Sequence, residues 1–314
     1  MNQYSITITT NRAHLLFSFV TIYSLLKHNQ DYDINIYLLH NNCLDMAEID
    51  DICNKFPMNQ FSNFKIHLVD VASVAIINNL PQQKYWTKEI YYKLFLQDLL
   101  PNVDRILHLD TDVIVVGNIK DFFNTDMEGI YFIGGEDYDD TLCVGVMLIN
   151  LTELRKINIL EEFKKAAIED NQITEQGFVN KVYRDKVRFT TENYIFTVGL
   201  LGYKEEFKRD STTKIIHLTN PKPFVLTRFK VSDLTPKCTL EYFPYLEDFI
   251  EPKSKWKYNL AKYYMLYGGG RIFNSLHRRF KREWRKKVQK RQDFFFKAEW
   301  WTNQIYKYAI IKKS

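Results

Sequence analysis

The chain has 314 residues, of which 46% are hydrophobic and 26% charged, and its net charge is +5. This composition is that of a globular protein and excludes a fibrous, low-complexity or largely disordered chain. The charge is unevenly distributed, because residues 253–314 hold 18 Lys and Arg against 3 Asp and Glu, whereas residues 1–252 hold 25 against 35. The two parts therefore suit different partners.

In chain order, apolar runs alternate with helical patterns. The runs predict strands, and the longer patterns predict helices that alternate with them. This order indicates an α/β sheet, in which ligands bind at the carboxyl ends of the strands. A composition change near Pro252 divides the chain into residues 1–250 and 251–314. The predicted strands cover residues 4–9, 34–39, 65–71, 105–109, 130–135, 144–150 and 214–218, and the predicted helices lie near 13–28, 45–56, 87–99 (with Thr87 as N-cap), 152–170 and 174–183.

The cysteines, the N-terminal segment and the apolar runs indicate the cellular compartment of the protein. Four cysteines, at positions 43, 53, 143 and 238, form no CxxC pair, so we expect neither a structural zinc site nor a disulfide scaffold. The N-terminal segment lacks the pattern of a secretory signal, and the longest apolar run, Leu15–Leu26, is shorter than the roughly 20 residues of a spanning helix. We therefore expect a cytoplasmic protein without a transmembrane segment.

The segment RILHLDTDVIVV (105–116) places Asp110 and Asp112 between two apolar runs. Strand alternation directs both carboxylates to the same side of the chain. Two like charges in an apolar setting are costly unless a cation compensates them, so a divalent metal ion with a diphosphate ligand is expected here. Two alternatives remain: a surface turn in which both aspartates bond their own backbone, and the D-x-D of an aspartate-nucleophile phosphatase.

Four motifs occur in a fixed order: HLDTDVIVVGNIKDFF (108–123), GVMLINL (145–151), EQGFVN (175–180) and HLTNPKPF (217–224). With these motifs, residues 4–225 resemble glycosyltransferase family 8, in particular bacterial lipooligosaccharide galactosyltransferases and glucosyltransferases. The resemblance implies that residues 1–250 form a GT-A catalytic domain, a Rossmann-like mixed α/β sheet flanked by helices. It also implies a UDP-galactose or UDP-glucose donor, Mn²⁺ or Mg²⁺, a glycan acceptor of a cell-surface polysaccharide, lipooligosaccharide or glycoprotein, and retention of anomeric configuration.

The same resemblance implies roles for single residues. Asp110 and Asp112 look like the aspartates that bind the metal ion and the ribose-diphosphate, and His217 looks like the third protein ligand. By itself His217 would be interpreted as a buried strand-end histidine, but the N-P-K-P-F that follows favours the metal. Lys222 matches the lysine that holds the diphosphate, and Gln176 matches the glutamine beneath the donor sugar. We therefore predict Gln176, Asp112 and Lys222 as the catalytic residues.

The chain also departs from the family pattern. The family's D-Q-D is Glu175, Gln176 and Gly177, which excludes a nucleophile at position 177 and favours front-face attack, with the UDP phosphate as base, over double displacement. Other usual residues of the family are replaced as well. Glu136 and Asp137 are either sugar contacts or a solvated acidic loop. The remaining changes are Lys93 for an arginine, Cys143 for an asparagine, Asn220 for a glycine, and Asn11 and Arg12 for an acidic pair. The predicted nucleotide contacts are Thr9, Asn11, Lys93, Asp110, Thr111, Asp112, Asn220 and Lys222, and the predicted sugar contacts are Glu136, Asp137, Cys143, Glu175 and Gln176.

Residues 253–314 contain four of the five tryptophans and a stretch with helical spacing, in which an apolar stripe opposes a basic face. This pattern is typical of an amphipathic helix at an anionic membrane surface, so we expect peripheral association with the inner face of the cell membrane and an acceptor that is lipid-linked. A helix packed on the catalytic domain is the alternative, and nucleic-acid binding is disfavoured. The stripe consists of Phe273, Leu276, Phe280, Trp284 and Val288, and the basic face of Arg278, Arg279, Lys281, Arg282, Arg285, Lys286 and Lys287.

Two other functions remain open at this point. The changes at positions 143, 177 and 220 are compatible with a non-catalytic relative that binds a nucleotide sugar and assists another transferase. A phosphohydrolase with Asp110 as nucleophile is the second alternative.

Overall fold

The computed structural model describes residues 3–55, 57–72, 88–137, 140–191, 194–198, 210–219, 237–250 and 255. The chain forms two compact units, Met1–Leu200 with Lys208–His217, and Leu201–Phe207 with Leu218–Ser314. Both sheets belong to the first unit, apart from the last residue of one strand, and helix α9 (Lys237–Glu247) belongs to the second. Almost all of residues 251–314 lie outside the described residues, so the predicted boundary and the amphipathic helix stay predictions.

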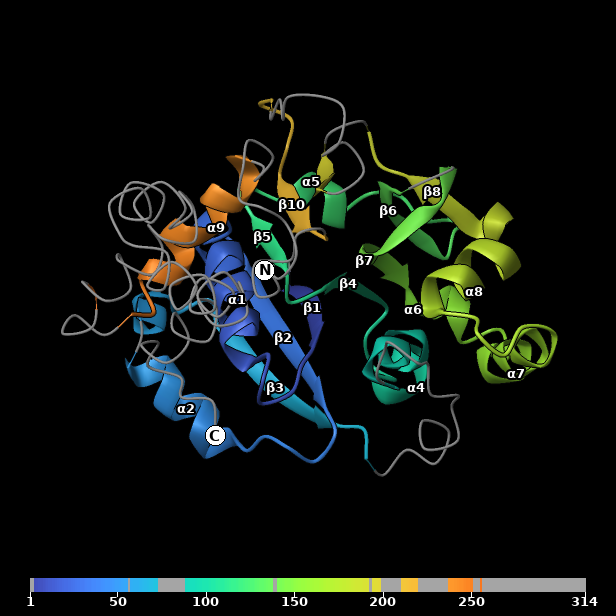
Figure 1. Cartoon of the computed structure of the whole chain (residues 1–314), viewed down its shortest axis with the longest axis horizontal. Helices are drawn as coiled ribbons and strands as arrows, with labels where there is room; N and C mark the ends of the chain where they lie inside the picture. Colours follow the sequence, from blue (N-terminus) through green and yellow to red (C-terminus); the bar gives the residue numbers. More distant parts are fainter. Residues whose placement is uncertain are drawn as a thin grey trace, which may run out of the picture. The chain divides into compact units, whose positions relative to one another are not determined.

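The larger sheet has seven strands in the order β3-β2-β1-β4-β7-β6-β8 (Figure 1). Strands β1, β2, β3 and β4 are parallel to their neighbours within this group, β7 is antiparallel to β4 and β6, and β8 is parallel to β6. The sheet is therefore mixed, as predicted. Its strands are β1 (Gln3–Thr9), β2 (Asp33–His40), β3 (Phe64–Asp70), β4 (Arg105–Leu109), β6 (Phe132–Glu136), β7 (Leu142–Asn150) and β8 (Val187–Phe189).

A second sheet, with three strands, begins shortly after β4 in the chain. Its strands β5 (Val113–Val115), β10 (Ile215–Leu218) and β9 (Ile195–Val198) lie in the order β5-β10-β9, and β5 is antiparallel to β10. The two apolar runs around Asp110 and Asp112 are thus strands of two different sheets, and the aspartates occupy the turn between them. Strands β5, β8 and β9 were not predicted as strands, because each has only three or four residues and no clear alternation.

Predicted helices at 13–28, 45–56 and 174–183 are confirmed, with ends that differ by at most two residues. Two predictions were wrong in detail. Residues 88–95 wind as a 3-10 helix before one α-helical turn, and Thr87 lies outside the described residues. The predicted helix 152–170 is two helices, because the Asn158 side chain caps the second one by accepting from the Glu161 backbone N–H. The helices are α1 (Leu15–His28), α2 (Met46–Lys55), η1 (Pro57–Gln60), η2 (Lys88–Phe95), α4 (Leu96–Leu99), α5 (Lys120–Phe123), α6 (Leu151–Leu154), α7 (Ile159–Glu169), α8 (Glu175–Val182) and η4 (Arg184–Lys186).

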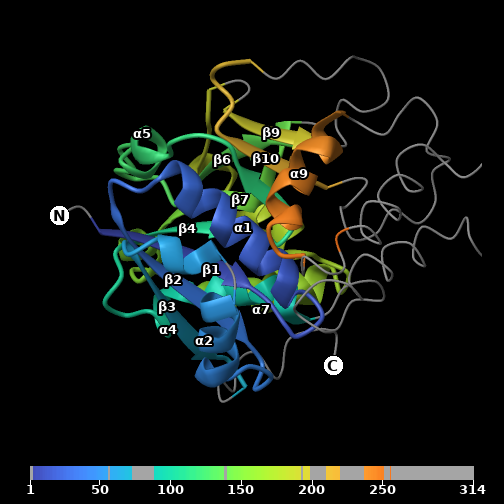
Figure 2. The ribbon, with the colours of Figure 1, turned by 90° about the vertical axis from the view of Figure 1, so that its left-hand side faces the viewer.

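Helix α1 lies between the β1–β3 part of the large sheet and the small sheet (Figure 2). Nearly all of its residues are buried, which explains an apolar run that also contains serine and threonine. Thr21 Oγ1 donates to the Val113 carbonyl at 2.8 Å, and Ser24 Oγ accepts from the Val115 N–H at 2.9 Å. These hydrogen bonds satisfy backbone groups of β5 on the side where no strand among the described residues pairs with it. In the described part of the chain, no helix has both the length and the apolar character needed to cross a bilayer.

Candidate active site

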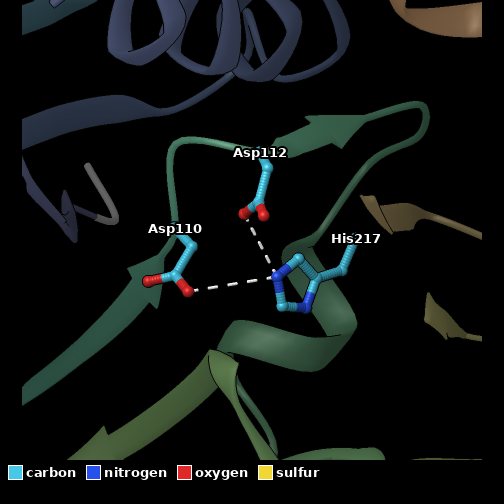
Figure 3. A group of neighbouring side chains, drawn as sticks. All are labelled: Asp110, Asp112 and His217. Carbon is cyan, nitrogen blue, oxygen red and sulfur yellow. Dashed lines mark ion pairs between the residues drawn. The ribbon is translucent and has the colours of Figure 1, made fainter. Parts of the chain in front are cut away.

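Three side chains converge where the two sheets meet: Asp110, Asp112 and His217 (Figure 3). One donor atom from each lies within 4.8 Å of the others. His217 Nε2 is 3.2 Å from Asp112 Oδ1 and 3.9 Å from Asp110 Oδ2. The fold explains this convergence, because the turn after β4 carries both aspartates and β10 pairs with β5 so that His217 lies opposite Val113.

The three side chains fit a divalent cation. They supply two carboxylates and an imidazole, a donor set that suits Mn²⁺ or Mg²⁺ in charge and in ligand type. Donor atoms that share one ion at about 2.1 Å lie roughly 3–4 Å apart, and His217 Nε2 lies at 3.2 and 3.9 Å from the two carboxylates. A methyl group on Gly145 would come within 2.1 Å of His217 Cε1 and 2.8 Å of Asp110 Oδ2, so glycine keeps this space open.

The electrostatic setting also favours a cation at this point. Burial would lower the pKa of His217, but the neighbouring Cys143 and Asp112 together raise it to about 10. The surroundings therefore stabilise a positive charge between the aspartates and the imidazole. A metal ion would supply that charge in place of the proton.

The other oxygen of Asp110 has separate partners. Oδ1 accepts from His108 Nε2 at 2.9 Å and from Lys93 Nζ at 3.1 Å. Burial would raise the pKa of Asp110, but Lys93 and His108 hold it well below its ordinary value. Burial is also the main reason that the pKa of His108 falls to about 4, so His108 is neutral at pH 7.

Lys93 lies buried among these groups, with a side chain only 3% exposed. Its Nζ also donates to the Val144 carbonyl at 3.3 Å and is 3.8 Å from Glu175 Oε1. Burial would lower the pKa of Lys93, yet Asp110 and Glu175 raise it, and burial raises the pKa of Glu175. The predicted nucleotide contact Lys93 is thus placed in an ion-pair network with one predicted metal ligand and one predicted sugar contact.

Gln176 and Asp137 form a second pair beside this network. Gln176 Nε2 donates to Asp137 Oδ2 at 2.7 Å, and its Oε1 accepts from the Val144 N–H at 3.4 Å. Gln176 stands in the first turn of α8, whose N-cap Thr174 accepts from the Gly177 N–H. The predicted sugar contacts Glu175, Gln176 and Asp137 therefore lie in one linked group, whereas Glu136 is exposed at the end of β6.

The predicted nucleotide contacts near the N-terminus follow β1. Thr9 ends the strand, and Asn11 Oδ1 accepts from the His14 N–H at 3.1 Å. His14 Nδ1 lies 3.4 Å from Thr111 Oγ1, which brings this loop beside the turn that carries the aspartates. Asn220 and Lys222 lie outside the described residues.

Cys143 Sγ lies 3.3 Å from His217 Nδ1, and the predicted contact of Cys143 with a sugar stays a prediction. Three further residues of the site were missed. His108 shares a strand face with Asp110 two residues later, and Gly145 is a glycine within an apolar strand; both signals were readable. Asn180 was not predictable in this way, since it binds the Leu142 N–H at 2.7 Å and the Leu142 carbonyl at 3.0 Å only through the tertiary fold.

Comparison with solved structures shows the GT-A fold. The galactosyltransferase LgtC, solved with donor and acceptor sugar analogues, superposes with a TM-score of 0.63 at 16% identity and covers 81% of this chain and 99% of its own. The apo form of the glycosyltransferase GlyE of Streptococcus pneumoniae gives a TM-score of 0.61 at 17% identity, with 78% of this chain and 60% of GlyE covered. At this level of identity the likeness establishes the fold alone.

Curated relatives are also glycosyltransferases by name. GlyF of Streptococcus pneumoniae serotype 4 is 26% identical over 235 residues, or 70% of this chain and 57% of GlyF. The lipopolysaccharide 1,2-glucosyltransferase of Escherichia coli is 22% identical over 218 residues, or 62% of this chain and 61% of that protein. The chain thus spans little more than half the length of these relatives. The profile described as Glycosyl transferase family 8 matches residues 5–223, and the chain belongs to that family.

Proposed function

We propose that this chain transfers a hexose, galactose or glucose, from a UDP-sugar to a glycan acceptor in the synthesis of a cell-surface polysaccharide, lipooligosaccharide or glycoprotein. The observation that carries this proposal is the convergence of Asp110, Asp112 and His217 at the junction of two sheets. Two carboxylates and an imidazole suit an ion bound to a diphosphate. Family membership and one relative named as a lipopolysaccharide 1,2-glucosyltransferase support the same class of reaction.

The chain's own residues have defined tasks in this proposal. Asp110, Asp112 and His217 hold Mn²⁺ or Mg²⁺, which supplies a Lewis acid for the diphosphate as UDP departs. Lys222 adds a further positive charge for the leaving group. Gln176, which hydrogen-bonds to Asp137 and the Val144 N–H, is proposed to support positive charge on the anomeric carbon with its side-chain carbonyl oxygen.

Retention of configuration is proposed to follow a front-face route. Position 177 is glycine, and its α-helix presents Gln176 and Glu175 instead of a pair of aspartates. Gln176 is a weak nucleophile, and Glu175 is held beside the Lys93 ammonium at 3.8 Å. We therefore favour a route in which UDP departs and the acceptor attacks on the same face, with a phosphate oxygen as base. This route, unlike double displacement, needs no nucleophile from the protein.

Residues 253–314 are proposed to hold the chain at the inner face of an anionic membrane, close to a lipid-linked acceptor. The support is the sequence alone, with 18 basic residues and an apolar stripe at helical spacing. Each basic side chain near such a surface contributes about 1 kcal/mol, so several contacts suffice for stable association.

The decisive experiment measures UDP release from a panel of UDP-sugars, with Mn²⁺ and with a chelator, for the unaltered chain and for Asp110→Asn and Asp112→Asn. We expect metal-dependent release from one sugar, and a loss of at least about 100-fold in either variant, because each removes a charged ligand. The matched control is Asp126→Asn, which changes an aspartate away from the site. Tight UDP binding without release from any sugar would favour a non-catalytic partner of another transferase. Phosphate release from simple phosphomonoesters would favour a phosphohydrolase.

A further inference from the structure

His108 lies in β4, two residues before Asp110, which directly follows the strand, so alternation places both side chains on the same side of the chain. Its ring is completely buried, and its Nε2 lies 2.9 Å from Asp110 Oδ1. A carboxylate can only accept hydrogen bonds, so Nε2 carries the proton and donates.

The other ring nitrogen, Nδ1, indicates that His108 does not serve only to fill space in the core. Nδ1 of His108 is buried and makes no hydrogen bond with any residue that the structure describes. A buried polar atom without a partner costs about 1–3 kcal/mol, and an apolar side chain of similar size would avoid this cost. We therefore attribute the role of His108 to the hydrogen bond that its Nε2 donates to Asp110.

The two oxygens of Asp110 face different partners. Oδ1 accepts from His108 and from Lys93, which uses both of its in-plane acceptor directions. Oδ2 points toward His217 Nε2, 3.9 Å away, on the side where Asp112 also lies (Figure 3). The carboxylate plane is thus fixed by donors that are not themselves candidate metal ligands.

We propose that His108 is a positioning residue that, together with Lys93, holds Asp110 so that Oδ2 alone is offered to the metal ion. The inference rests on the proposed metal-dependent function. Hydrogen bonds of this kind fix the orientation of a ligand before the ion arrives, so that binding the ion does not have to order the side chain.

The test measures the Kd of Mn²⁺ in the presence of saturating UDP, from the electron paramagnetic resonance signal of free Mn²⁺. We expect His108→Phe to raise the Kd by about 10- to 100-fold, the usual effect of losing a partner of a metal ligand. His108→Gln keeps an N–H group at the same reach and is expected to restore the Kd to within about threefold. The matched control is His67→Phe, which removes a strand histidine whose Nε2 bonds to Asn35 instead.

The outcomes separate this inference from the proposed function. Failure of the unaltered chain to bind Mn²⁺ overturns the metal-dependent function. Binding by the unaltered chain, with the same Kd in His108→Phe, overturns the positioning role of His108 alone, as does equal weakening in the Phe and Gln variants. Nitrogen-15 spectra of the unaltered, histidine-labelled chain provide a measurement that needs no variant: Nε2–H is expected for His108, and Nδ1–H overturns the inference.

Discussion

Replacing Gly145 by alanine adds one methyl group at the centre of the site. The new Cβ would lie 2.1 Å from His217 Cε1, 2.7 Å from His217 Nε2 and 2.8 Å from Asp110 Oδ2. Carbon atoms in favourable contact are about 3.5–4.0 Å apart, so the imidazole would have to move by roughly 1.4 Å or more. Metal-ligand distances tolerate only about 0.2 Å.

A displacement of this size removes His217 as a ligand. We expect the Mn²⁺ Kd of Gly145→Ala to rise by about 100-fold, and UDP release to fall at least as far. The free energy of unfolding should fall by a smaller amount, about 1–3 kcal/mol, because overpacking in a rigid core has this cost. The loss is therefore expected in metal affinity at a protein concentration where the variant remains folded.

The assay is a Mn²⁺ titration in the presence of UDP, with circular dichroism to confirm folding. Gly177→Ala is the matched control, since its Cβ would meet Thr174 Oγ1 at 3.4 Å and Ile173 Cγ1 at 3.5 Å, which are ordinary contacts. Alanine also favours the helix there by about 0.5–1 kcal/mol. An unchanged Mn²⁺ affinity in a folded Gly145→Ala variant would refute the placement of the ion between these residues.

Two further predictions concern residues beside the metal ligands, and a third concerns the basic C-terminal residues. Lys93→Met should lower the free energy of unfolding by about 3 kcal/mol in urea, because Asp110 and Glu175 lose their shared buried cation; a change below about 1 kcal/mol would contradict this. Cys143→Val should weaken Mn²⁺ binding by about tenfold whereas Cys143→Ser preserves it, since only serine keeps an acceptor for His217 Nδ1; equal affinities would assign Cys143 another role. The full chain should sediment with anionic vesicles and be released by added salt, and salt-independent or absent binding would refute the proposed membrane contact.

Much of the fold could be predicted because strands such as β4, β6 and β7 are buried along almost their whole length and give continuous apolar runs. The runs at 105–109 and 113–116 were recognised, but no local signal tells that they belong to different sheets. Strand β8 exists because it pairs with β6, and Asn158 interrupts the helix predicted over 152–170; both depend on context beyond a periodic pattern.

The residues of the site differ in how far the sequence alone could predict them. Asp110 and Asp112 form a local motif, and two carboxylates between apolar runs already indicate a bound cation. His217 follows more than 100 residues later, and only the resemblance connected it with them; the structure does so through the pairing of β5 with β10. Lys93 was expected beside the nucleotide, and its ion pairs with Asp110 and Glu175 could not be foreseen from spacing.

The turn between β4 and β5 has a consequence for the thermodynamics of the whole first unit. An ion held by Asp110, Asp112 and His217 would cross-link two segments distant in the chain, and such an ion has no comparable site in the unfolded ensemble. Binding is then linked to folding, and an ion at 100 times its Kd would add about 2.7 kcal/mol to the stability of the native state. Thermal denaturation with and without Mn²⁺ would therefore report occupancy of this junction without any sugar donor being present.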